Sequence, residues 1–263
     1  MSDRITIPNN YSVAVACRDE ILFCSNNTNS SNILLSVEDF FCIDYTTFTR
    51  MEYKGSNFSM LQKLLNLHGN IRSLTINSKS PMIECFNSIN KFQLKELSIF
   101  TVMDQITWNN ITEFTELEYL HVIDNSIYKW PKCNNITCYG PNKVPNVETV
   151  RLIYPDKEIE LQNNNKTVIL EKSESTVTIN HNIDELFLTD GNYTLQGNGY
   201  IKQLSLDNAV VSTTLNITTI IVNASGLLPE LPKCENLVIR GFARWNPDAL
   251  PMTNVLYHSD HSK

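Results

Sequence analysis

Apolar residues recur along the chain with a spacing that predicts a stack of short strands. The clearest unit runs from Leu117 to Pro131, with apolar residues at relative positions 1, 4 and 6, Asn125 at position 9 and Ile127 at position 11. Positions 4 and 6 of a strand face the same side, so stacked units can bury together what one unit cannot bury alone. The pattern therefore predicts a solenoid, in which each unit packs against its neighbours.

The same frame continues on both sides of this unit. Steps of about 23 residues toward the N-terminus reach Leu94/Leu97/Ile99, Ile71/Leu74/Ile76 and Phe48/Met51/Tyr53. Toward the C-terminus the steps shorten to about 14 to 18 residues. These shorter units are Cys133/Ile136/Cys138, Val147/Val150/Leu152, Val168/Leu170 in a weaker unit from Asn165, Ile183/Leu186/Leu188, Ile201/Leu204/Leu206, Ile217/Ile220/Val222, Cys234/Leu237/Ile239 and Met252/Val255/Tyr257. A shift of one residue in any weak unit would exchange its inward and outward side chains.

The length of a unit predicts the segment that returns to the next strand. The longer units leave room for a helical turn, and residues 60–68 fit one, with Ser59 as the N-cap and Gly69 as the end. Its inward side chains would be Leu61, Leu64 and Leu65. The shorter units lack this room, so we expect extended or irregular returns and a change of curvature near Cys133.

The unit that begins at Leu117 resembles the leucine-rich-repeat family, and the resemblance covers about residues 48–257. It implies an α/β fold leaning to all-β: one long curved parallel sheet with short helical or irregular return segments. The implied domains are a cysteine-containing cap over 1–47, a solenoid over 48–257 that is regular to about 132, and a polar tail over 258–263. An ordinary β-rich or α/β domain whose alternating strands imitate repeats is the alternative.

The chain is also similar to secreted animal members of this family, including insect immune ones, and its seven cysteines bear on that likeness. The family implies a disulfide in the cap, with Cys17 and Cys24 paired, or one of them with Cys42. Cys133, Cys138 and Cys234 fall on inward positions, where we interpret them as small buried apolar residues, with disulfides as the alternative. Because the number of cysteines is odd, at least one thiol stays unpaired or open to another chain, which allows a disulfide-linked oligomer beside a non-covalent one.

Asparagine is abundant, with 32 residues, and ten of them begin an N-x-S/T sequon, where about five would arise by chance. The sequons are at Asn10, Asn26, Asn29, Asn57, Asn110, Asn135, Asn165, Asn192, Asn216 and Asn223. Their excess favours an extracellular glycoprotein. The first residues do not read as a signal peptide, so the sequence is either a mature form or fragment, or that of a cytoplasmic protein.

Charge and motifs narrow the function further. A formal net charge of -7 argues against a nucleic-acid partner, and no apolar run is long enough to predict a membrane span in this chain. The motifs of phosphate loops, hydrolases and zinc enzymes are missing, so we predict no enzyme, cofactor or metal. The pair His258 and His261 could hold a metal, but a polar tail explains it better.

Outward strand positions supply the candidate binding site. At position 5 the second half of the chain reads Arg151, Ile169, Phe187, Ser205, Ile221, Val238 and Leu256, an apolar row that indicates an interface if the frame is right. The best central residues are Tyr119, His121, Arg151, Tyr154 and Phe187, since aromatic residues and Arg dominate interface energetics. A glycan at Asn135 would shield part of the same face.

We predict a non-enzymatic protein-recognition module, secreted or an ectodomain, for example in innate immunity or cell-surface recognition. An intracellular leucine-rich-repeat scaffold or substrate adaptor is the alternative.

Overall fold

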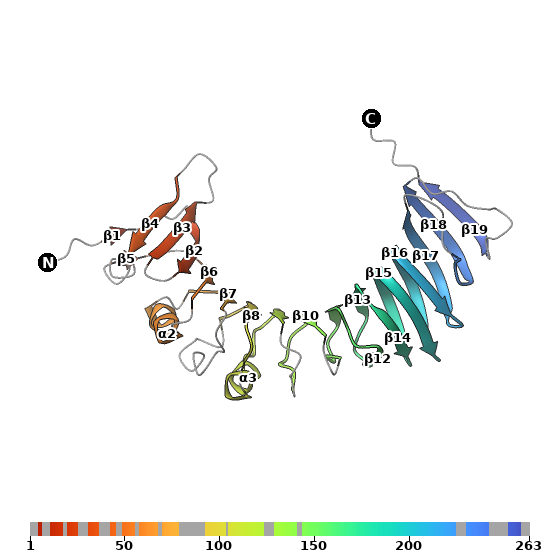
Figure 1. The fold of residues 1–263 in the computed structure, drawn as a ribbon, viewed down its shortest axis with the longest axis horizontal. Coiled ribbons are helices and arrows are strands. Elements are labelled where there is room, and N and C mark those ends of the chain that lie inside the picture. Colours follow the sequence, from red (N-terminus) through yellow and green to blue (C-terminus); the bar gives the residue numbers. More distant parts are fainter. Residues whose placement is uncertain are drawn as a thin grey trace. The chain divides into compact units, whose positions relative to one another are not determined.

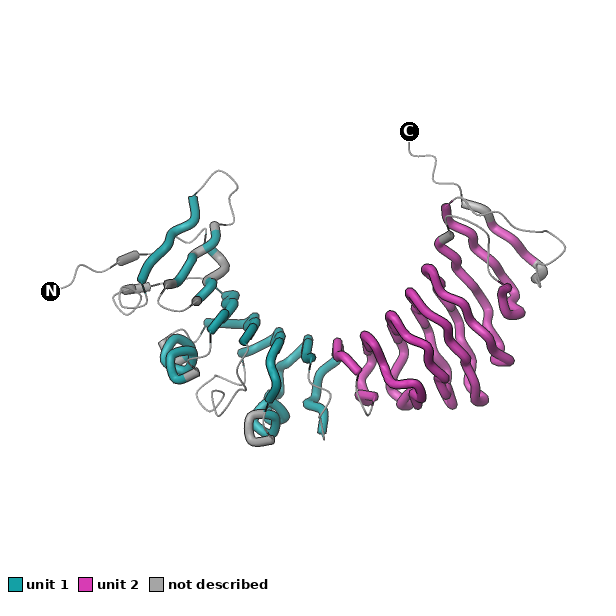
Figure 2. Tube along the Cα trace, viewed as in Figure 1, with its two compact units in different colours: residues 1–124, 128–134 teal, residues 125–127, 135–263 magenta. Residues whose placement is uncertain are grey.

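The computed structural model places strands along most of the described chain, with short helices in the first half. The described residues are 5–6, 11–17, 20–25, 31–36, 43–45, 49–55, 58–67, 70–78, 93–103, 105–123, 129–140, 144–224, 230–241 and 252–258. They divide into two compact units, residues 1–124 with 128–134, and residues 125–127 with 135–263 (Figure 2).

Four parallel strands form the sheet of the first unit. These are β6 (Arg50–Tyr53), β7 (Ser73–Asn77), β8 (Glu96–Phe100) and β9 (Tyr119–Val122). Their register aligns Met51, Leu74, Leu97 and Leu120 in one column, and all four side chains are buried. The frame of the longer units is therefore confirmed, since position 4 of each unit packs on position 4 of the next.

Two helices lie in the returns of the first unit, α2 (Phe58–Leu67) and α3 (Gln105–Ile111). The buried side chains of α2 include Leu61, Leu64 and Leu65, as predicted. The expected N-cap was wrong, because the helix begins at Phe58 and Ser59 lies inside its first turn. Spacing of apolar residues locates a helix but leaves its first residue uncertain by one or two positions. Gly69 lies outside the described residues.

An antiparallel layer covers the first edge of this sheet. Strands β2 (Tyr11–Cys17), β3 (Glu20–Ser25) and β4 (Ile33–Ser36) pair antiparallel in chain order, and β2 also pairs parallel with β6. The second pairing sets Ala14 beside Met51 and Ala16 beside Tyr53, so the inward frame extends into β2. A separate pair joins β1 (Ile5–Thr6) to β5 (Ile43–Tyr45).

The second unit is a parallel β-solenoid, and the described chain makes about six turns of it (Figure 1). Its first sheet holds β10 (Asn135–Tyr139), β11 (Thr149–Ile153), β13 (Thr167–Glu171), the first parts of β15 (Asn182–Gly197) and β16 (Tyr200–Thr213), then β17 (Asn216–Ala224), β18 (Cys234–Gly241) and β19 (Met252–His258). One inward column runs through Ile136, Val150, Val168, Leu186, Leu204, Ile220 and Leu237 to Val255. The weak frame of the second half is thereby confirmed by register.

The returns of this unit form a second parallel sheet, which the expectation of a single sheet did not include. It consists of β12 (Glu158–Glu160), β14 (Glu174–Ile179) and the second parts of β15 and β16. Buried Val177 and Leu195 pair across β14 and β15, so this sheet covers the core from its other side. The predicted extended returns are correct, and pairing between successive turns joins them into the additional sheet.

A repeated backbone turn connects the two sheets. Tyr154, Lys172, Asp190 and Asn208 follow one another at equal intervals along the chain, and each has a positive φ between 48° and 56°. This left-handed conformation is uncommon outside glycine, asparagine and aspartate. The shared geometry of the corner therefore imposes the same φ on whatever residue occupies it.

Candidate interaction surface

The predicted apolar row lies on the outer face of the first sheet of the second unit. Register places its members side by side on seven strands: Arg151, Ile169, Phe187, Ser205, Ile221, Val238 and Leu256. We call these residues the central row. On the six strands that hold the row from Arg151 to Val238, the neighbours before and after each member, such as Leu186 and Leu188 around Phe187, are buried. The central row therefore faces outward, and the one-residue shift that could have inverted it is excluded.

Exposure varies along the central row. Arg151 and Leu256 are exposed, Ile169, Phe187, Ser205 and Val238 are half-buried, and Ile221 is nearly covered. The preceding row on the same face is Thr149, Thr167, Glu185, Gln203, Thr219, Asn236 and Asn254, and the following row includes Glu171, Thr189, Asp207, Asn223 and Arg240. An apolar stripe between two polar rows matches the core-and-rim composition of protein interfaces.

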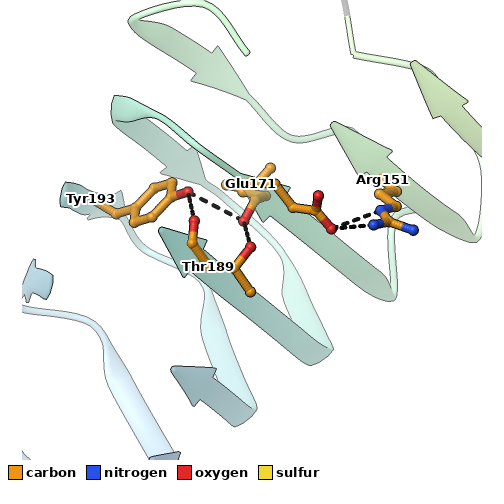
Figure 3. A network of polar contacts seen from close by, with 5 residues as sticks. Arg151, Glu171, Thr189 and Tyr193 are labelled. Carbon is orange, nitrogen blue, oxygen red and sulfur yellow. Dashed lines mark hydrogen bonds and ion pairs between the residues drawn. The ribbon is translucent and has the colours of Figure 1, made fainter. Parts of the chain in front are cut away.

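Arg151 is held in place at one end of the central row. Its Nε and Nη2 atoms both bond to Oε1 of Glu171 on the next strand, at 2.8 and 2.6 Å (Figure 3). In the same view Tyr193 and Thr189 meet at the turn between the sheets, where the Tyr193 hydroxyl donates to the carbonyls of Leu170 and Thr189 at 3.2 and 2.9 Å. The guanidinium thus has a fixed position and retains donors for a ligand.

Tyr154 combines an exposed ring with an unusual backbone. Its side chain is 55% exposed, its φ is 52°, and its ring lies 6.5 Å from that of Tyr139. The Lys172 ammonium lies 5.5 Å from the centre of the Tyr154 ring. Sequence reasoning identified Tyr154 but missed Lys172 and Tyr139. The repeat spacing, which leads from position 154 to position 172, would have indicated Lys172.

The five predicted site residues fall in both units. Tyr119 and His121 belong to β9 of the first unit, where Tyr119 is exposed and the His121 ring meets Phe100 edge-on with centroids 4.8 Å apart. Arg151, Tyr154 and Phe187 belong to the second unit. Within that unit Arg151 and Phe187 both align with Ile169 between them. Arg151, Ile169 and Phe187 therefore lie on the same face of one sheet.

The candidate glycosylation sites differ sharply in accessibility. Asn192, Asn216 and Asn223 are exposed, and Asn110 and Asn135 are half-buried. The side chain of Asn165 is fully buried, and its Nδ2 donates to the carbonyls of Pro145 and Val147 at 2.9 and 2.6 Å. A glycan on that nitrogen is incompatible with this fold, so Asn165 has to be removed from the candidates. Asn10, Asn26, Asn29 and Asn57 lie outside the described residues.

Free thiols in the described part of the chain include Cys24, Cys138 and Cys234. Burial raises the pKa of the Cys138 thiol and, to a smaller extent, that of Cys234. In the hairpin of β2 and β3, Cys24 lies opposite Val13 and Cys17 lies opposite Glu20. These positions are at opposite ends of the hairpin, so a disulfide between Cys17 and Cys24 would require another register. Cys42 and Cys85 lie outside the described residues.

Other kinds of site were sought in the same residues. The described residues contain no cluster of three or more His, Cys, Asp or Glu side chains that could hold a metal ion. His261 lies outside this part of the chain. Neither described helix has the length and apolar character needed to cross a membrane. Comparison with protein families, with curated proteins and with solved structures finds no match to this chain.

Proposed function

We propose that this chain is a non-enzymatic recognition module that binds a protein partner through the outer face of the first sheet in its second unit. The observation that supports the proposal is the central row, in which apolar side chains face outward on neighbouring strands of a parallel sheet. Exposure to water does not stabilise the apolar side chains of Ile169, Phe187 and Val238. A partner that covers them would remove apolar area from solvent, which is favourable. Arg151 adds directional hydrogen bonding at one end.

The first unit supports a leucine-rich-repeat assignment as part of the proposal. Its strands recur at the constant spacing of the longer repeats and its returns contain α2 and α3, the arrangement that this family implies. The second unit departs from that arrangement because its returns are strands. The proposal therefore concerns a solenoid that combines helical returns in one unit with a second sheet in the other.

A partner is needed to test the recognition surface. The biotinylated chain can be screened against an array of purified extracellular domains, and Kd measured for each domain retained. Substitution of both Ile169 and Phe187 by Ser should weaken binding by about tenfold or more, because truncated central contacts of an interface carry most of its energy. The matched control replaces Thr176 and Thr194, which pair on the second sheet, by Ser. Equal affinity of the Ile169/Phe187 variant and the control would contradict the proposal.

The proposed location is extracellular, supported by the exposed sequons at Asn192, Asn216 and Asn223. A second candidate, an intracellular scaffold or adaptor, is favoured by the free thiols of Cys24, Cys138 and Cys234, since stable disulfides are typical of secreted proteins. Peptide mapping of the protein purified from its own source separates the two. Glycans at the exposed asparagines would support secretion, and unmodified asparagines together with alkylatable Cys24 and Cys234 would support the scaffold.

A further inference from the structure

The dimensions of the central row restrict the shape of the segment that can cover it. From Arg151 to Val238 the row crosses six neighbouring strands, which gives it a length of about 24 Å at about 4.8 Å per strand. The polar rows on its two sides lie two residues away along each strand, a distance of about 6.6 Å. The apolar surface is therefore a narrow stripe that runs across the strands.

An α-helix along this stripe fits both dimensions. A helix with its side chains is about 10 to 12 Å wide, so its flanks reach the two polar rows, which are about 13 Å apart. One helical turn rises by about 5.4 Å, so a helix of about 16 residues stays within about 3 Å of the strand spacing over the whole row. An extended segment places side chains on one side only every 6.7 Å or so, and loses register within about three strands.

The middle of the stripe has a carboxylate on each side. Glu185 belongs to the polar row before Phe187, and Asp207 belongs to the polar row after Ser205. Glu185 is half-buried and Asp207 is exposed. Neither carboxylate forms an ion pair within the described residues. A helix that covers Phe187 and Ser205 is therefore stabilised by lysine or arginine on both borders of its apolar face.

The other charges of these rows lie at the two ends of the stripe. Glu171 is paired with Arg151 at one end, and Arg240 follows Val238 at the other end. Acidic residues at the ends of a helix would complement the two arginines, whereas basic residues suit its middle. The net charge of -7 also favours the approach of a ligand that is basic overall.

We propose that the central row binds an amphipathic α-helix of the protein partner, with basic side chains that bond to Glu185 and Asp207. Apolar side chains of the helix cover Ile169, Phe187 and Val238. The inference rests on the proposed function, because it specifies the partner of the same face.

Two synthetic peptides of identical composition test the shape of the ligand. Each has about 18 residues of leucine, alanine, lysine and glutamate, and a fluorescein label. In the first peptide leucine recurs at every third or fourth residue, lysines border the leucines in the middle, and glutamates occupy the ends. In the second peptide leucine alternates with the other residues. Fluorescence anisotropy with the full chain should give the helical peptide a Kd of about 1 to 100 µM and the alternating peptide a Kd at least about tenfold higher.

Variants of the chain test the two carboxylates. Glu185→Gln combined with Asp207→Asn should weaken binding of the helical peptide by about tenfold and reduce its dependence on salt, because two complementary charges are lost. The matched control combines Glu158→Gln with Glu174→Gln, which removes two exposed carboxylates from the second sheet. The control should retain the wild-type Kd within about twofold, and circular dichroism should show that both variants remain folded.

Equal affinity of the two peptides would overturn the proposal, as would an equal loss of affinity in the Glu185/Asp207 variant and its control. So would a helical peptide that binds the Ile169/Phe187 variant as tightly as the wild type, because the peptide would then lie elsewhere. The recognition surface can fail separately. If a partner domain loses affinity for the Ile169/Phe187 variant but the helical peptide does not bind the wild type, the surface stands and the helical ligand alone is excluded.

Discussion

Tyr154 occupies a backbone position that suits asparagine or glycine better than an aromatic residue. The equivalent residues of later turns include Asp190 and Asn208, and the Asn208 side chain donates to the Asp190 carboxylate at 2.8 Å. A bulky residue with positive φ costs on the order of 1 kcal/mol, and an exposed ring recovers little of that through burial. A tyrosine at such a site fits a role in binding better than one in stability.

This interpretation gives a reciprocal pair of substitutions. Tyr154→Asn should leave the free energy of unfolding within about 0.5 kcal/mol of the wild type, because relief of backbone strain offsets the lost contact with Lys172. Asn208→Tyr should cost about 1 kcal/mol or more, because it adds the strain and removes a hydrogen bond. Denaturant unfolding measures both. A loss of more than about 2 kcal/mol in Tyr154→Asn, a structural contribution of ordinary size, would mean that Tyr154 is a stabilising residue.

Tyr193 makes stability depend on alkaline pH. Burial raises the pKa of Tyr193 to about 12, and the carboxylates of Asp190 and Glu171 add to the rise. Since the folded-state pKa exceeds the usual value of about 10, the stabilisation is complete below pH 10 and is lost as the pH rises through 12. Tyr193→Phe should cost about 1 kcal/mol at pH 7 through its lost hydrogen bonds. Its deficit relative to the wild type should shrink between pH 10 and 12 in denaturant titrations, and a constant deficit would contradict this assignment.

At the scale of elements, the turns of the second unit approach each other so closely that one position excludes a side chain. A Cβ atom on Gly191 would lie 2.1 Å from the backbone oxygen of Ser173. Ser173 also makes polar contacts at this turn. Its hydroxyl contacts that of Ser175, and the Ser175 hydroxyl donates to the Asp156 carbonyl at 2.8 Å. The separation of the turns is therefore fixed by backbone contacts as well as by the sheets.

Gly191→Ala should destabilise the protein by about 1 to 3 kcal/mol, because one strand has to shift away from its neighbour. Gly55→Ala is the comparison, since the three atoms nearest to its Cβ belong to the Tyr53 side chain and none of them is backbone. Thermal unfolding followed by circular dichroism compares the two. If Gly191→Ala had the same melting temperature as the wild type, the close approach between β15 and the preceding turn would not exist in solution.

At the scale of the whole molecule, stability in a solenoid is a sum of turns and of the contacts between neighbouring turns. Within the second unit, Leu204 lies between Leu186 and Ile220 and is fully buried, whereas Val255, the last described member of the same column, is 44% exposed. A residue with neighbours on both sides loses more packing on truncation than one that is partly exposed.

Leu204→Ala should therefore cost about 2 to 5 kcal/mol, and Val255→Ala less than about 1 kcal/mol. Chemical denaturation gives both values. A large cost at Val255 would indicate that its side chain is covered in the folded chain.

The pattern of apolar residues along the chain was enough to predict which residues face the core. Alternation within strands and repetition between units both select the same positions, so the columns through Leu97 and Leu186 could be predicted without knowledge of any contact. The central row followed from the same frame, because outward residues are those between inward ones.

The conformation of the returns and the contacts between polar groups became known from the folded structure. The second sheet arises because extended returns of successive turns lie within hydrogen-bonding distance, and the positive φ of Tyr154 and Lys172 follows from the corner that joins the sheets. The bond between Arg151 and Glu171, and the burial of Asn165 within a sequon, depend on residues about 20 positions apart meeting across turns. A local sequence pattern does not predict these contacts between turns, because it shows the periodicity along the chain and not the distances between residues of neighbouring turns.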